Sequence, residues 1–291
     1  MRGFYIFRTP RSLALTKRRP KTQYSCELTA VLVLYNLPSM KTNKLGRNGA
    51  RIAAGVLIER NGEVLSFVLD NPPENEVTGV MFETMLAELR AEALEAKARV
   101  LRIRARGEVF CTGRERAGRD AASIKKESKR IIEFKRALRC SPLISIAEVQ
   151  GGALGFGFGL AIVCDLVLVA DGARLGFPEM KHGLAPSAIM SYLGEYVLPR
   201  HAFPLVLFGD AIDAHRAMQI GLVSQVCVAN ELGREADGLV KRILELDDAA
   251  CRRCKEFFLT AQQNTFEQNC RLAVETLTLG SLAALEKKTK R

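Results

Sequence analysis

The sequence has little of what identifies several large classes of protein. It has three histidines among 291 residues, and no cluster of histidine and cysteine at the spacing of a metal site. No uninterrupted apolar run reaches the roughly 18 residues of a membrane span, so we expect none. The absence of a G-K-[ST] triplet excludes a phosphate-binding P-loop. The eight cysteines lack the spacing of a disulfide framework, which indicates reduced thiols.

The positive charge is concentrated at one end of the chain. Of the net charge of +11, residues 1–50 supply +9, from ten basic side chains and the single acid Glu27. A basic protein can bind nucleic acid, but this charge belongs to an N-terminal extension, so we expect no nucleic-acid partner. The extension is rich in arginine and nearly free of acids, as organellar transit peptides are. It lacks their clear amphipathic period and contains three prolines.

We therefore expect residues 1–50 to be a basic, poorly ordered extension. A mis-called start codon is an equally good interpretation, and Met40 would then be the natural first residue. The expected location of the protein is the cytoplasm, or the mitochondrial matrix if the extension is a transit peptide.

Strand and helix signals alternate up to about residue 229. Asn61-Gly62 separates two apolar runs and predicts a β-hairpin. Further strands are predicted at 100–106, 143–149, 166–169 and 222–228, and helices at about 80–98, 123–139, 186–198 and 201–208. Asp213 and Gly221 are the predicted caps of one more helix. After Asn230 the pattern predicts about three helices. The sequence thus predicts an α/β domain over 51–229 and an all-helical module over 230–291.

Five glycines lie between a predicted strand and an apolar helix, at positions 151, 152, 155, 157 and 159. Such a turn brings backbone N–H groups close to a ligand, and the helix adds the positive end of its dipole. The dinucleotide fingerprint G-x-G-x-x-G fails from Gly155 and from Gly157, where Leu160 and Ile162 occupy the third glycine position. Close packing without any ligand remains the alternative.

Several segments together resemble the enoyl-CoA hydratase/isomerase (crotonase) family in order and spacing. Four carry the main motifs: Glu108–Glu115 (EVFCTGRE), Ala147–Gly159 (AEVQGGALGFGFG), Cys164-Asp165 and Leu175–Glu179 (LGFPE). Asn71–Asn75 (NPPEN) and Gly221–Val226 (GLVSQV) are similar to two more. The resemblance covers about residues 52–285. It implies an α/β fold with a ββα spiral core, a helical C-terminal trimerisation module, and a homotrimer or a dimer of trimers.

The resemblance also implies an acyl-CoA thioester as ligand, with coenzyme A as part of the substrate and no separate cofactor. The family chemistry forms a thioester enolate, whose oxygen is bound by two backbone N–H groups. Carried over by position, these are the amides of Arg114 and Phe156. Fixed backbone donors of this kind stabilise developing negative charge with little reorganisation. The implied substrate-binding positions are Cys111, Gly113, Gly155, Gly159, Pro178 and Ser187.

The carboxylates decide which reaction the resemblance implies. Hydratases of the family carry one Glu three residues after the second oxyanion donor and another in F-G-x-P-E. Here the first position is Gly159 and the second is Glu179. One carboxylate suffices for isomerisation of a 3-enoyl-CoA to a 2-enoyl-CoA, in which the base removes a proton from C2 and returns it to C4. The alternative interpretation of Glu179 is an exposed loop acid.

Three functions remain open at this point. The preferred one is an isomerase with Glu179 as its single acid/base. The others are an enoyl- or dienoyl-CoA hydratase with a variant second group, and a non-catalytic acyl-CoA binder. Other polar residues are expected to be structural: His182, Asp165 and Glu148. The helical pair Cys251 and Cys254 is expected to be buried in the packing of its helix rather than to bind a metal. Cys111 is not expected to be a nucleophile, because no histidine is placed to activate it.

Overall fold

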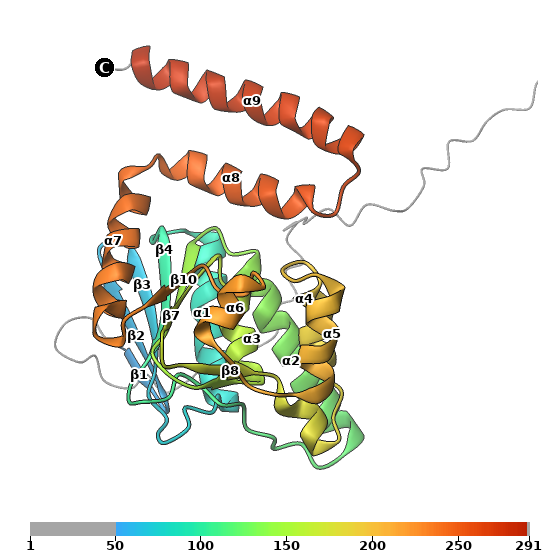
Figure 1. Ribbon diagram of the computed structural model, residues 1–291. Coiled ribbons are helices and arrows are strands. Elements are labelled where there is room, and N and C mark those ends of the chain that lie inside the picture. Colours follow the sequence, from blue (N-terminus) through green and yellow to red (C-terminus); the bar gives the residue numbers. More distant parts are fainter. Residues whose placement is uncertain (1–50, 290–291) are drawn as a thin grey trace, which may run out of the picture. The chain divides into compact units, whose positions relative to one another are not determined.

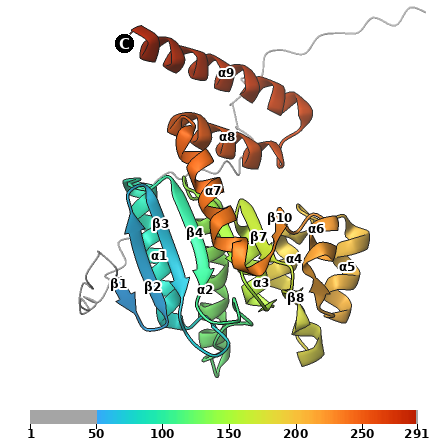
Figure 2. The same cartoon turned by 60° about the vertical axis from the view of Figure 1, so that its left-hand side comes forward.

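The computed structural model describes residues 51–289, and the predictions for residues 1–50 lie outside them. The described residues form a seven-stranded mixed sheet and a small three-stranded sheet (Figures 1 and 2). The large sheet has the order β1 (Arg51–Ala53), β2 (Val56–Asn61), β3 (Val64–Leu69), β4 (Val100–Ala105), β5 (Ile144–Val149), β7 (Leu166–Ala170) and β10 (Gln225–Cys227). Strands β1 to β3 pair antiparallel, and those from β3 to β10 pair parallel. The small sheet contains β6 (Ala153–Leu154), β8 (Arg174–Gly176) and β9 (Ile212–Asp213).

The predicted hairpin is confirmed. Asn61 pairs with Val64 at the end of β2, and Gly62 adopts a φ of +57° in the turn between the two strands. Positive φ is the conformation that a tight hairpin turn requires and that glycine adopts without steric cost.

Helices cover both faces of the large sheet (Figures 1 and 2). Successive strand residues point to opposite faces, so Leu101 packs in the core with α1–α3 and Val100 packs against α7. The helices are α1 (Gly79–Leu94), α2 (Ala121–Arg139), α3 (Phe156–Val163), α4 (Ser187–Leu193), α5 (Pro199–Phe208), α6 (Ala214–Gln219), α7 (Leu232–Glu245), α8 (Asp248–Ala261) and α9 (Phe266–Thr289), with short 3₁₀ turns η1 (Pro178–His182) and η2 (Ala229–Glu231). None of these helices is long and apolar enough to cross a membrane.

Three helices follow Asn230, as predicted, and Asp213 caps α6 through its side chain. Three expectations were inaccurate. The glycine-rich segment is not all turn, because α3 begins inside it at Phe156. The strand expected over 222–228 covers only Gln225–Cys227, since the Leu222 N–H still donates to Ala217 and ends α6. The helix expected over 186–198 ends at Leu193.

Asn75 ties the loop after β3 to the chain around residue 106. Its side chain is 2% exposed, and its φ of +51° is one that asparagine tolerates better than most residues. Its Nδ2 donates to the carbonyls of Arg106 (2.9 Å) and Val109 (2.7 Å), while its Oδ1 accepts from the N–H of Asn71 (2.8 Å). One buried amide therefore satisfies three backbone groups of two separate loops.

We predict that Asn75→Asp lowers the free energy of unfolding by about 2–4 kcal/mol, because two buried carbonyls lose their donor and face a carboxylate instead. Urea unfolding measures this loss, which should shrink at acidic pH as the new carboxyl becomes protonated. Asn61→Asp in the exposed hairpin turn is the control and should leave stability nearly unchanged. Equal free energies of unfolding for the two variants would contradict this structural role of the Asn75 amide.

Candidate functional site

Two segments far apart in sequence meet at the start of α3. Gly152 accepts the N–H of Cys111, and Leu154 donates to the Cys111 carbonyl, so the loop after residue 110 runs beside β6. A Cβ atom on Gly157 would overlap the carbonyl of Cys111. Only glycine permits this approach. The 111–114 loop consequently lies directly against the first turn of α3.

The amides predicted to form the oxyanion hole both lack a partner. Val77 donates to Gly113 and accepts from Glu115, so the intervening Arg114 N–H points away from Val77. The Phe156 N–H belongs to the first turn of α3, where helix geometry supplies no acceptor. Within residues 51–289 neither N–H has a hydrogen-bond acceptor. Both donors are therefore available to an external group.

Glu179 lies beside the N-terminus of α3 because the small sheet holds it there. The Gly155 N–H donates to Gly176 (2.9 Å), which joins β6 to the end of β8, and η1 with Glu179 follows directly. A Cβ on Gly155 would stand 3.2 Å from Glu179 Oε1, and Gly155 has a φ of +52°. The positive φ favours glycine at this position, and a side chain there would crowd the Glu179 carboxylate. The site brings Glu179 and the first turn of α3 together, as predicted.

The Glu179 side chain is not that of an exposed loop acid. The residue is half-buried, and its Oε2 is a buried atom without a hydrogen-bond partner in the described residues. Phe177, which precedes η1, is fully buried and stacks on Phe158 with ring centroids 5.0 Å apart. An unpaired buried carboxylate oxygen is costly in a folded protein and is commonly found where a ligand or proton is bound.

The space beside Gly159 is filled by side chains that the sequence analysis did not single out. A Cβ at this position would lie 2.7 Å from Lys135 Nζ and 2.8 Å from Tyr192 Oη, and it would overlap Ile189 Cδ1. Lys135 donates to Tyr192, whose hydroxyl donates to the Gly159 carbonyl (3.0 Å). Burial lowers the pKa of the Lys135 amine to about 7. The hydrogen-bonded side chains of Lys135 and Tyr192 thus occupy the space that a side chain at position 159 would fill.

A signal for Lys135 was present in the sequence. The buried positions of α2 are Ile131, Phe134, Lys135 and Leu138, which follow the 3.6-residue period of one helix face. A lysine within such a buried stripe is unusual, because lysine side chains are mostly exposed to solvent. The helix was predicted, but this exception inside its apolar stripe was overlooked.

The other predicted binding residues lie around this centre with different exposure. Cys111 is buried and donates through its thiol to Gly113 (3.2 Å). Burial raises the pKa of that thiol to about 12, which disfavours the thiolate that a nucleophilic cysteine needs. Pro178 is half-buried at the start of η1, and Ser187 is exposed at the start of α4.

Asp165 and Glu148 support the fold, as predicted. Asp165 accepts from Ser145 and forms an ion pair with the buried Lys255 (2.7 Å). Glu148 is buried and bonded to Nε (2.5 Å) and Nη2 (2.9 Å) of Arg102, so its side chain points away from the glycine-rich segment. Both carboxylates are engaged and unavailable for chemistry.

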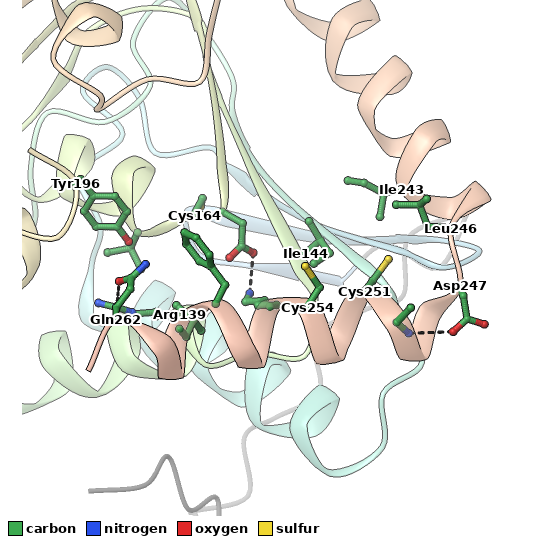
Figure 3. Close-up of a pocket in the computed structure, with 16 residues that line it drawn as sticks. Arg139, Ile144, Cys164, Tyr196, Ile243, Leu246, Asp247, Cys251, Cys254 and Gln262 are labelled. Carbon is green, nitrogen blue, oxygen red and sulfur yellow. Dashed lines mark hydrogen bonds and ion pairs between the residues drawn. The ribbon is translucent and has the colours of Figure 1, made fainter. Parts of the chain in front are cut away.

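A cavity of about 510 Å³ lies under α8, apart from the Glu179 site (Figure 3). Cys251 and Cys254 line it, but Cys251 is only half-buried and Cys254 is exposed, so the burial predicted for this pair was wrong. In residues 51–289 no group of three or more His, Cys, Asp or Glu could hold a metal ion.

Comparison with known proteins gives consistent matches over this region. The family model "Enoyl-CoA hydratase/isomerase" matches residues 59–284. The 2,3-dehydroadipyl-CoA hydratase of Escherichia coli K12 is 28% identical over 240 residues, covering 79% of this chain and 91% of that protein. A Mycobacterium smegmatis enoyl-CoA hydratase has a TM-score of 0.75 at 25% identity, covering 80% and 96%. A Thermobifida fusca protein solved with CoA has a TM-score of 0.72 at 31% identity, covering 80% and 95%.

The close approach at Gly157 can be tested by stability. We predict that Gly157→Ala lowers the free energy of unfolding by about 1–3 kcal/mol, because the new methyl group must displace the backbone of Cys111. Gly238→Ala in α7 meets open space and should raise it by about 0.5–1 kcal/mol. Denaturant unfolding compares the two variants. A Gly157→Ala protein as stable as Gly238→Ala would contradict the contact.

Proposed function

The chain belongs to the enoyl-CoA hydratase/isomerase family, and on that basis we propose that it converts a 3-enoyl-CoA into a 2-enoyl-CoA. Glu179 is the proposed base at C2 of the acyl group. The amides of Arg114 and Phe156 are the proposed donors to the thioester oxygen. The substrate brings its own coenzyme A, and the proposed reaction uses no further cofactor.

The observation that carries this proposal is the Glu179 carboxylate, with glycine in place of a carboxylate at position 159. Glu179 Oε2 is buried beside the first turn of α3 and has no partner in the described residues. The groups that surround position 159, where the hydratase pattern has a second Glu, are Lys135, Tyr192 and Ile189. A proton transfer along the acyl chain needs a base and a stabilised enolate, and it needs no second carboxylate to hold a water.

The chemistry follows from this arrangement. Glu179 takes a proton from C2, and the negative charge moves to the thioester oxygen, where the two N–H groups and the positive end of the α3 dipole stabilise it. The Glu179 carboxylic acid then returns a proton at C4, and the double bond shifts from C3–C4 to C2–C3. Removing one backbone donor of such a site typically costs about 10²–10³ in rate. The Thermobifida fusca protein solved with CoA supports a CoA thioester as ligand.

Hydration is the second candidate function, and two observations favour it. The Escherichia coli relative is named a hydratase, as is the Mycobacterium smegmatis neighbour. The polar pair Lys135–Tyr192 could also hold a water in place of the second carboxylate. A binder without turnover is the third possibility.

One experiment separates these functions. The protein is incubated with a panel of 3-enoyl- and 2-enoyl-CoAs, and the products are read by mass and by chromatography. Isomerisation moves the double bond at constant mass, whereas hydration adds one water. We predict isomerisation of the 3-enoyl-CoAs. A mass gain would support the hydratase instead, and CoA binding without any turnover would support the binder.

Glu179 itself is tested by Glu179→Gln, which keeps the shape and removes the base. We predict a loss of isomerase kcat of about 10²–10⁴-fold with CoA binding retained in a thermal-shift assay. Glu275→Gln, on the exposed surface of α9, is the matched control and should keep full activity. Undiminished activity of Glu179→Gln would rule out the proposed role.

We also propose that the C-terminal module mediates assembly into a homotrimer or a dimer of trimers. Helix α9 packs against α8 and carries a series of exposed apolar side chains: Val274, Leu277, Leu279, Leu282 and Leu285. Large apolar side chains exposed in such number on one helix are typical of subunit interfaces.

Light scattering tests the assembly. The wild type should have three or six times the chain mass of 32.1 kDa, and the double variant Leu277→Glu/Leu282→Glu should dissociate into smaller species, because two charges would be buried at the interface. Leu94→Glu at the exposed end of α1 is the control and should leave the mass unchanged. A monomeric wild type would contradict the proposal.

A further inference from the structure

Lys135 is an unusual residue for the interior of a protein. It lies on the buried face of α2 and is 5% exposed, although a charged amine in such a place costs several kcal/mol unless it is paired. Two other cations of the described residues are paired: the buried Lys255 with Asp165 and the half-buried Arg102 with Glu148. No carboxylate of the described residues lies within salt-bridge distance of Lys135.

Neutral groups surround the Lys135 amine instead. It donates one hydrogen bond, to Tyr192, and its Nζ lies 4.7 Å from the ring centre of Tyr192 and 5.4 Å from that of Phe156. Aromatic faces attract a cation, but they do not use its N–H donors. An ammonium has three donors, so part of its hydrogen-bonding capacity remains for a group that enters the site.

Lys135 and Glu179 flank successive turns of the same helix. Glu179 Oε1 stands 3.2 Å from the Cβ position of Gly155, and Lys135 Nζ stands 2.7 Å from that of Gly159. The Gly159 N–H donates to the Gly155 carbonyl (3.0 Å), which places these positions about one turn apart, about 6 Å along the axis. A few carbons of an acyl chain span that distance. A chain whose C2 meets Glu179 can therefore place C4 near Lys135.

The charge state of Lys135 is compatible with proton transfer. Burial lowers the pKa of its amine to about 7, and the negative charge of Glu179 acts in the opposite direction. The titratable groups that face the amine are Glu179 from η1 and Tyr192 from α4. Burial raises the pKa of the Tyr192 hydroxyl well above its ordinary value, so that hydroxyl stays neutral. A general acid works best when its pKa lies near the operating pH.

We propose that Lys135 is a second catalytic residue, which delivers the proton to C4 after Glu179 has removed the proton from C2. The proposal rests on the isomerase function and refines it, since Glu179 then does not have to serve both carbons. Tyr192 is a positioning residue that holds the amine over position 159 through its hydroxyl.

The proposed step balances within the site. The C2–H bond breaks, and its proton converts the Glu179 carboxylate into a carboxylic acid. The electron pair of the broken C2–H bond forms the dienolate. The dienolate then takes a proton from the Lys135 ammonium at C4, which leaves a neutral amine and a new C4–H bond. A proton passes from the Glu179 acid to the amine through water or solvent before the next turnover. No redox partner is needed.

A deuterium label tests the inference. A 3-enoyl-CoA with two deuterium atoms at C2 is converted in ordinary water, and the product is analysed by mass. We expect the wild type to lose one deuterium in each turnover, because Glu179 takes the label and Lys135 supplies a solvent-derived proton. We expect Lys135→Met to lose about 10²–10⁴-fold in kcat and to retain label at C4, because Glu179 then has to serve both carbons.

Three variants accompany this measurement. Methionine approximates the length of lysine and suits the apolar surroundings, so Lys135→Met should fold. Tyr192→Phe keeps the ring and removes the hydroxyl, and should give a smaller loss of kcat with partial retention of label, even if Lys135→Met is unstable. Lys241→Met on the exposed face of α7 is the control and should behave as wild type.

The pH profile provides a second readout. Because only the ammonium can deliver the proton, wild-type kcat/KM should fall as pH rises through about 7. The residual activity of Lys135→Met should lack this fall. A role in packing alone would leave the profile of the two proteins the same, and that result would overturn the inference.

The other outcomes are equally decisive. Three results would each overturn the role of Lys135 and leave the isomerase function standing. They are transfer of deuterium to C4 by the wild type, a Lys135→Met rate within threefold of wild type, and a slow Lys135→Met that still loses one deuterium in every turnover. A wild type that does not isomerise 3-enoyl-CoAs would overturn the proposed function, and the inference with it.

Discussion

The site depends on the close approach of two backbones. Gly157 lets the first turn of α3 rest on the carbonyl of Cys111, and a hydrogen bond from Gly155 to Gly176 brings the end of β8 to the same point. Neither contact leaves room for a side chain at those glycines. The 111–114 loop, the start of α3 and η1 converge because glycines remove the bulk between them, and the Glu179 carboxylate follows from that convergence.

The sequence predicts the segments that meet at this site better than it predicts the short strands and the buried lysine around them. The hairpin at Asn61-Gly62, the helix cap at Asp213 and the interleaved strands were predicted because local turn chemistry and periodicity determine them. Strands β6 and β8 were missed, since segments of two and three residues carry no alternating pattern. Glu179 and Gly159 were found through family motifs, whereas Lys135 lies outside any motif. Periodicity puts it on the buried face of α2, but only the packing of α2 on α3 brings its amine to Gly159.

Electrostatics divides the buried charges of the molecule into two kinds. Asp165 and Glu148 are each neutralised by a buried or half-buried cation and join elements of the fold. Glu179 and Lys135 lie near each other, and each retains unused hydrogen-bonding capacity. Structural charges in proteins are paired, and charges left incompletely paired concentrate at functional sites. The contrast between these pairs distinguishes the site from the rest of the core without reference to any motif.

The close packing at Gly159 also limits which substitutions this position can accept. A glutamate at position 159 would have to share its space with the ends of Lys135, Tyr192 and Ile189, which come from α2 and α4. A glutamate therefore fits there if these side chains change rotamer or are replaced by smaller ones. The present arrangement thus differs from the hydratase pattern in the packing of α2 and α4 as well as in one residue.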